Sequence, residues 1–210
     1  MDWTNTVIFT LWNGQQVLIL DFISSILGLM TVFLAGRASK ANFWVGYVYN
    51  AALFMLFWHN HLFANLLLQP ISLAINIYGQ YRWSHPKVEE ESNGDASTLK
   101  VSKLTWRQRI FAIAMVLVVA FLWGLVLQNF FTSDPVPYLD TVVTVLILTA
   151  QLLSAMKKWD CWIAWLVVDS CQIPMHFSVG NIMMTIVCTL YLANGIWSLV
   201  SWGKKYREHE

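Results

Sequence analysis

The chain has 210 residues, of which 57% are hydrophobic and 12% are charged. A soluble domain usually carries about 25% charged residues, so this composition indicates a protein whose main solvent is the lipid bilayer. At roughly 20 residues for each span, the length fits six to eight transmembrane helices. The formal net charge of +1 gives no strongly basic surface, which argues against a nucleic-acid partner.

Long apolar runs bounded by charged and turn residues predict seven membrane-spanning helices. In chain order these are 17–35, 43–58, 62–83, 110–130, 139–156, 161–178 and 180–202. Residues 84–109 contain three consecutive Glu residues and an Asn-Gly pair, and this pattern predicts a solvated linker. The run 110–130 is apolar along nearly its whole length and is predicted to be a lipid-facing connector helix.

The Lys and Arg residues predict how the chain is oriented. All 13 of them lie in four segments: the turn after the first helix, residues 82–109 at the end of the third helix and in the linker, the turn after the fifth helix, and the C-terminal tail. The alternate connections contain none. Because basic loops stay in the cytoplasm, the sequence predicts a multi-pass protein of the inner (plasma) membrane with its N-terminus outside and its C-terminus inside.

An internal repeat relates the first three helices to the last three. A shift of 118 residues places Trp44 on Trp162, Tyr47 on Trp165 and Asn76 on Asn194, and a shift of 119 places Asp21 on Asp140 and Asn50 on Asp169. With one helix between them, the two units run in the same direction, which gives a 3+1+3 parallel pseudo-repeat in an all-α membrane protein. The predicted units are 1–83 (N-terminal segment and first bundle), 84–109 (cytoplasmic linker), 110–130 (connector), 139–202 (second bundle) and 203–210 (cytoplasmic tail).

A stripe of polar and aromatic residues follows the sixth predicted helix. Its members are spaced three and four residues apart and are Trp162, Trp165, Asp169, Gln172 and His176. An Asp at the centre of a transmembrane helix costs roughly 2.5–3.5 kcal/mol, so Asp169 is expected to face a cavity or a partner. One interpretation is a neutral acid hydrogen-bonded between helices. The other is a site for a cation or a proton.

Polar residues on the neighbouring helices could line the same cavity. They are Gln69, Asn76 and Gln80 on the third helix, Asp140, Thr144, Gln151 and Ser154 on the fifth, and Tyr191 and Asn194 on the seventh. The alternative is that these amides and hydroxyls only hold helices together. The chain has no P-loop, no H-E-x-x-H pair and no nucleophile elbow, so an enzyme is not predicted, nor is a cofactor or a metal site. A seven-helix sensor or receptor that binds without transporting stays open.

Two segments carry a resemblance to a known family. Leu66-Leu67-Leu68-Gln69 is followed by Asn76-Ile77-Tyr78-Gly79 and Trp83, and the Trp162-x-x-Trp165 pair is followed by Asp169. From about Asp21 to Trp202 the chain resembles the PnuC family of bacterial nicotinamide riboside transporters. The resemblance implies a SWEET-like fold and uptake of a vitamin by facilitated diffusion, with the substrate phosphorylated inside the cell. Related branches carry thiamine, riboflavin or deoxynucleosides.

The resemblance also implies a substrate site and its partners. Trp162 and Trp165 would contact the rings of the substrate, Asp169 would balance the charge of a pyridinium, and Gln and Asn side chains would bind sugar hydroxyls. The expected substrate-binding residues are Trp162, Trp165, Asp169, Gln172, Asn194, Gln151, Asn76, Gln69, Tyr191 and Asn50. The expected function is uptake of nicotinamide riboside (vitamin B3) for NAD biosynthesis, with thiamine as the nearest alternative because thiazolium is also cationic. The partners are this small molecule and the lipid bilayer, and a homo-oligomer is left open.

Overall fold

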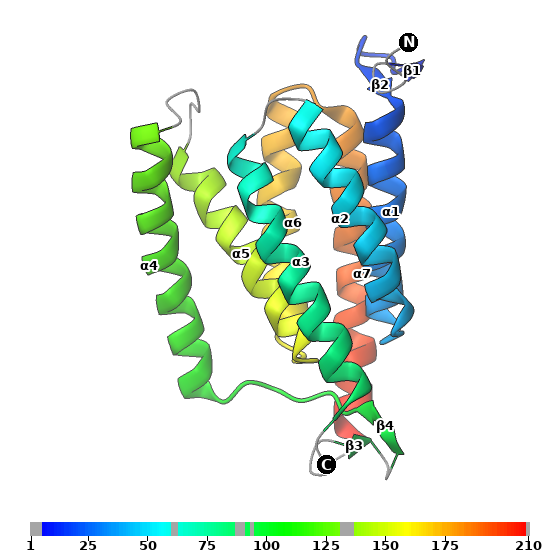
Figure 1. The fold of residues 1–210 in the computed structure, drawn as a ribbon, viewed down its shortest axis with the longest axis vertical. Coiled ribbons are helices and arrows are strands. Elements are labelled where there is room, and N and C mark those ends of the chain that lie inside the picture. Colours follow the sequence, from blue (N-terminus) through cyan, green and yellow to red (C-terminus); the bar gives the residue numbers. More distant parts are fainter. Residues whose placement is uncertain (1–5, 60–62, 87–90, 93–94, 131–136, 209–210) are drawn as a thin grey trace.

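The structure is a computed structural model that describes residues 6–59, 63–86, 91–92, 95–130 and 137–208. The predicted outer turns at 59–61 and 131–138, the acidic part of the linker and the first residues of the N-terminal segment fall wholly or partly outside these ranges. The all-α prediction of seven helices is confirmed (Figure 1). The helices are α1 (Ile19–Gly36), α2 (Ala41–His59), α3 (Phe63–Ser84), α4 (Trp106–Phe130), α5 (Pro137–Ala155), α6 (Cys161–Ser178) and α7 (Ile182–Arg207).

The helix bounds differ from the predicted ones mainly where basic residues extend a helix beyond its apolar run. α4 begins at Trp106, and α7 continues to Arg207, four to five residues past the predicted ends. Hydropathy marks the edge of the membrane, whereas backbone hydrogen bonding continues while long basic side chains reach into water. By length and composition, α1, α4 and α7 are each long and apolar enough to cross a membrane.

Two short antiparallel hairpins, which the sequence did not predict, accompany the helices. β1 (Val7–Thr10) pairs with β2 (Gln16–Leu18) just before α1, and β3 (Glu91–Ser92) pairs with β4 (Asp95–Leu99) in the linker. They lie at opposite ends of the helices (Figure 1). The chain therefore has a small β element at each predicted membrane surface.

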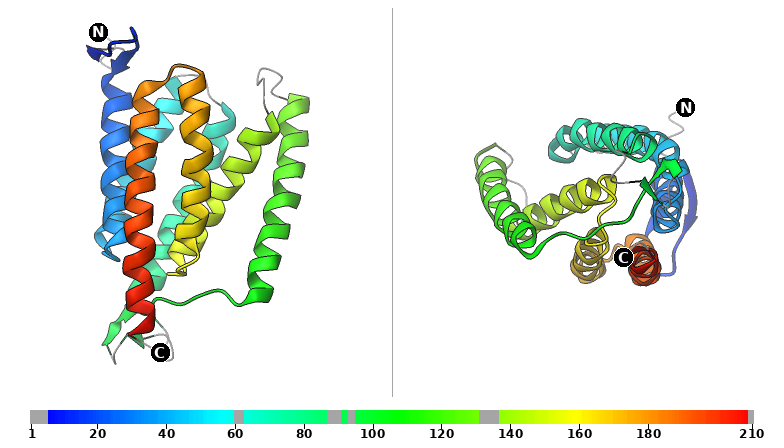
Figure 2. Two further views of the ribbon diagram at one scale, coloured as in Figure 1. Left: turned by 180° about the vertical axis from the view of Figure 1, so that it is seen from behind. Right: turned by 90° about the horizontal axis from the view of Figure 1, so that it is seen from below.

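Six helices form a closed ring. α1 packs on α2, α2 on α3, α3 on α5, α5 on α6, α6 on α7, and α7 on α1 (Figure 2). α4 stands outside this ring and packs on α5. Large apolar side chains of α4 such as Phe111, Ile113 and Phe121 are exposed, as expected for a connector helix that faces lipid.

The turns between the first two helices of each unit have the same backbone conformation. Ala38 and Lys157 have φ values of 58° and 54°, the two positive values among the described residues other than glycine. In each turn the next residue donates its amide to the carbonyl five residues earlier, Ser39 at 3.0 Å and Lys158 at 2.8 Å. These are the bonds of the Schellman motif, and the two copies lie 119 residues apart.

Two buried tryptophans repeat the same relation across the ring. The Trp83 indole N–H donates to the Ala155 carbonyl at 3.0 Å, and the Trp202 indole N–H donates to the Gly36 carbonyl at 2.8 Å. Both donors and both acceptors are related by the shift of 119. Each tryptophan therefore joins the third helix of one unit to the first helix of the other.

The register of 118 residues is thus wrong in part, because it pairs Trp44 with Trp162. Trp44 is 64% exposed, whereas Trp162 is 1% exposed. The counterpart of Trp162 is Phe43, which is 4% exposed and lies 119 residues earlier. A one-residue error rotates a position by about 100° around a helix, which is enough to move a side chain from the interior to the lipid face.

The end of the linker is packed against the helix ring, which departs from the solvated segment expected for residues 84–109. Leu99 and Val101 are 3% and 4% exposed and belong to the cluster that contains Trp83 and Trp202. Ser102 is bonded to the α5–α6 turn through its amide and its carbonyl, at 3.2 and 2.8 Å. The apolar residues Leu99 and Val101 in this otherwise polar segment were the available signal for packing, because a linker that only bridges two units does not need apolar side chains.

Candidate functional site

A cavity of about 430 Å³ lies inside the helix ring. Its lining residues come from all six ring helices and from the start of the chain before α1, and none of those that the structure describes comes from α4. Ligand sites for small molecules usually measure about 300–1,000 Å³. The cavity therefore has the size of a small-molecule site.

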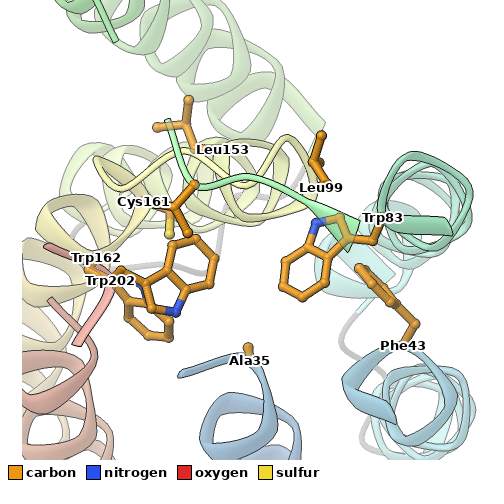
Figure 3. Packing of buried hydrophobic residues seen from close by; sticks show 9 residues of the cluster. Ala35, Phe43, Trp83, Leu99, Leu153, Cys161, Trp162 and Trp202 are labelled. Carbon is orange, nitrogen blue, oxygen red and sulfur yellow. The ribbon is translucent and has the colours of Figure 1, made fainter. Parts of the chain in front are cut away.

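An aromatic layer lies at the end of the cavity where the basic residues gather, and two of its members, Phe43 and Trp162, line the cavity. The aromatic floor consists of Phe43, Trp83, Trp162 and Trp202 (Figure 3). Phe43 meets Trp83 edge to face at 5.1 Å, and Trp162 meets Trp202 in the same way at 5.5 Å. These two pairs are related by the repeat, so each unit supplies half of the floor.

Polar residues mark the opposite end. Gln15, Asp21 and Asn181 line the cavity there. The Gln15 amide donates to the Asn181 side chain at 2.9 Å and accepts the Met183 amide at 3.2 Å. The segment before α1 is thereby fastened to the start of α7, beside the end of the cavity that is predicted to face outward.

Asp169 lies in the cavity wall and is 2% exposed. It lies close enough to Cys188 and Tyr191 on α7 to interact with them electrostatically. Asp21 is the other acid of the lining, and no Lys, Arg or His occurs among the described lining residues. The cavity is therefore acidic and offers no positive side chain to balance Asp169.

The structure brings nine of the ten expected site residues to this cavity. They are Asn50, Gln69, Asn76, Gln151, Trp162, Trp165, Asp169, Gln172 and Tyr191. Asn194 is the exception, since it is not among the lining residues and its side chain donates to the Val32 carbonyl of α1 at 3.2 Å. Its expected place in the site is corrected to a contact between α7 and α1.

Two residues of the expected polar stripes also lie elsewhere. Gln80 accepts a hydrogen bond from the Tyr47 hydroxyl between α3 and α2, and neither residue lines the cavity. His176, the last member of the α6 stripe, is absent from the described lining. The stripe therefore enters the cavity only from Trp162 to Gln172, about 15 Å of helix.

Several polar atoms of the wall have no hydrogen-bond partner among the described residues. They are the side-chain oxygens of Asn42, Asn50 and Gln69 and the indole nitrogen of Trp162. Buried polar atoms are normally paired, and an unpaired one costs roughly 1–3 kcal/mol. These three acceptors and one donor have almost no accessible surface, so the wall side chains would have to turn before a ligand in the cavity could pair with them.

The two tryptophans of α6 differ in their surroundings. Trp162 is almost fully buried and packs on Trp202 in the floor, whereas Trp165 is half-buried. Trp165 therefore has more ring surface to offer a ligand, while the indole N–H of Trp162 is an unpaired donor.

The sequence predicted only Asn50 from the inward face of α2. Asn42, Gly46, Tyr49 and Leu53 line the cavity beside it. Their spacing of three and four residues was the available signal. The shift of 118 concealed it, because it drew attention to Trp44 and Tyr47. Among the residues that the structure describes, no group of three His, Cys, Asp or Glu side chains is placed to hold a metal ion.

A ring of helices around an acidic, polar cavity of this size has the architecture of a multi-pass membrane transporter. Residues 18–204 match the model of the nicotinamide mononucleotide transporter family, and the chain belongs to this family. It is accordingly a membrane transporter for a small vitamin substrate and not an enzyme.

Similar proteins support this assignment. The riboflavin/roseoflavin transporter RibM of Streptomyces davaonensis is 28% identical over 99% of this chain and 94% of its own length. The nicotinamide riboside transporter PnuC of Escherichia coli is 26% identical over 87% and 85% of the two chains. A crystal structure of the vitamin B3 transporter PnuC superimposes with a TM-score of 0.73 and 20% identity, covering 91% of this chain and 83% of that one. This chain therefore has the fold of that structure.

Proposed function

We propose that this chain takes up nicotinamide riboside across the inner membrane by facilitated diffusion. The observation that carries the proposal is the buried Asp169 carboxylate in a cavity whose described lining has no Lys, Arg or His. Nicotinamide riboside contains a positively charged pyridinium ring. A carboxylate without a protein cation beside it favours a cationic ligand, because burying it alone is costly.

The remaining wall suits the other parts of this molecule. The unpaired oxygens of Asn50 and Gln69, once these side chains turn toward the cavity, would accept hydrogen bonds from ribose hydroxyls, which are donors. Trp165 offers an aromatic face to a flat cationic ring through stacking and cation–π attraction. Gln151, Gln172 and Asn76 supply further amides within the cavity.

Riboflavin is the second candidate, favoured by the similarity to RibM over 99% of this chain. Its ribityl hydroxyls could use the same acceptors, but its ring system is neutral and would gain little from the charge of Asp169. Thiamine, which is cationic, would gain from that charge. The charge at position 169 therefore separates the cationic substrates from riboflavin.

The test is uptake by the purified protein in liposomes. Labelled nicotinamide riboside should enter the liposomes until its concentration is the same inside and outside. No ion or proton gradient across the liposome membrane should be needed. Asp169→Asn should weaken its apparent affinity about ten- to hundredfold, the usual worth of a hydrogen bond or contact with a charged group. Asp21→Asn, at the outer end, is the matched control and should change affinity much less.

Competition identifies the substrate. Unlabelled nicotinamide riboside should compete more strongly than thiamine or riboflavin. If riboflavin competes best and Asp169→Asn leaves its affinity unchanged, the chain is a riboflavin transporter. No uptake of nicotinamide riboside would refute the proposal.

A further inference from the structure

Two tyrosines occupy the wall of the cavity beside α1. Tyr49 of α2 and Tyr191 of α7 line the cavity, and their hydroxyls are hydrogen-bonded to each other. Tyr191 also lies within electrostatic range of Asp169. The pair therefore borders the acidic part of the cavity.

The tyrosine pair rests against Gly28 of α1. A Cβ added at Gly28 would overlap the Tyr191 hydroxyl and would lie 3.2 Å from the Tyr49 hydroxyl. Gly28 has no positive φ, so it is required for the space that it leaves and not for its backbone conformation. A tyrosine ring is rigid, and on the far side of this pair lies the cavity. A larger residue at position 28 would therefore push Tyr191 inward.

At the interface between α5 and α3, which the repeat relates to the interface between α1 and α7, the large and the small side chain have exchanged places. The shift of 119 relates Gly28 to Ile147 and Tyr191 to Ser72. The α1–α7 interface combines the smallest residue on the first helix with a large aromatic on the last, whereas α5 and α3 carry a large residue and a small one at the same positions. The side of the cavity formed by α1 and α7 therefore differs in shape from the side formed by α5 and α3.

We propose that Gly28 is a specificity-determining residue, because the space it leaves for the Tyr191 hydroxyl sets how bulky a ring system the acidic side of the cavity accepts. This inference rests on the proposed vitamin transport. It makes Gly28 a positioning residue that acts through Tyr191 without touching the substrate.

The experiment compares uptake of nicotinamide riboside and riboflavin in liposomes by the wild type, Gly28→Ala, Tyr191→Phe and the double variant. Gly28→Ala should raise the half-saturating concentration by about tenfold or more for a transported vitamin, as expected for overpacking, and more for the bulkier riboflavin. Tyr191→Phe removes the hydroxyl that the new methyl group meets. The double variant should therefore return to within about twofold of Tyr191→Phe alone.

Gly195→Ala is the matched control. Its added Cβ would meet only the end of the flexible Leu166 side chain, at 3.1 Å, so affinity and the preference between vitamins should stay within about twofold of the wild type. Should Gly28→Ala fail to fold, Tyr191→Ala provides the second test. By enlarging the acidic side it should shift the preference toward riboflavin at least about fivefold.

The outcomes separate this inference from the proposed function. The role of Gly28 is overturned, while transport stands, by any of three results. These are an unchanged affinity in Gly28→Ala, a loss of affinity that persists in the double variant, and an unchanged preference between the two vitamins in Tyr191→Ala. If the wild type carries riboflavin and not nicotinamide riboside, the proposed substrate is wrong and Gly28 is judged on riboflavin. If it carries neither vitamin, both are overturned.

Discussion

Lys157 is a buried lysine whose charge should make the stability of this protein depend on pH. It lies in the α5–α6 turn, is 5% exposed, and donates from its ammonium group to the Leu99 carbonyl at 2.5 Å. The ammonium also lies 4.6 Å from the centre of the Trp83 ring. Burial, and after it the positive charges of Lys205 and Lys40, lower the pKa of Lys157 from 10.5 to about 8.

The sign and size of the effect follow from this lowered pKa. A fall from 10.5 to about 8 corresponds to roughly 3 kcal/mol that disfavours the protonated lysine in the folded state. Below pH 8 both states are protonated, and the whole penalty is present. As the pH rises from about 8 to 10.5, the folded protein loses this proton while the unfolded chain keeps it, so stability should increase.

Lys157→Met isolates this contribution, because methionine keeps a long side chain and has the same difficulty with a positive φ. Thermal unfolding in mild detergent, followed by tryptophan fluorescence, measures the stability of the wild type and the variant across this pH range. The stability difference should move by roughly 3 kcal/mol in favour of the wild type between about pH 8 and 10.5. Lys158→Met, at the next position, is the control for loss of a nearby charge. A difference that stays constant with pH would refute the reasoning.

Two further predictions concern contacts around the aromatic floor. Trp83→Phe and Trp202→Phe each leave a helix-end carbonyl without its indole donor, so each should lower the free energy of unfolding by about 1–3 kcal/mol, and thermal unfolding should show similar losses for the two. A large loss for one and none for the other would contradict the symmetry of the floor. Asp160→Ala removes the acceptor of the Leu104 amide at 2.8 Å and the partner of Arg109 at 2.7 Å, so the end of the linker should be cut faster by a protease added from the cytoplasmic side. An unchanged cleavage rate would show that Leu99 and Val101 hold the linker without these bonds.

The sequence by itself determined the features that depend on local transfer into the bilayer. The seven helices, the connector and the gathering of basic residues at one end follow from hydropathy and charge, because each span must satisfy its own backbone and each charge must reach water. The repeat and most of the inward-facing polar residues were also readable, since a polar side chain in a span is costly unless it faces a cavity.

The tertiary structure decided which of these polar residues face the cavity. Asn194 and Tyr191 are three residues apart on α7, yet Tyr191 lines the cavity and Asn194 bonds to the backbone of α1. Helix rotation settles this, and close contacts such as the one at Gly28 fix the rotation. A shift of 118 or 119 fits the sequence about equally well, and the tertiary structure selects 119 through the paired turns at Ala38 and Lys157 and the matching indole bonds of Trp83 and Trp202. The rotation of each helix and the register of the repeat depend on contacts between segments that are distant in the sequence. Neither hydropathy nor the spacing of residues along one helix could therefore predict them.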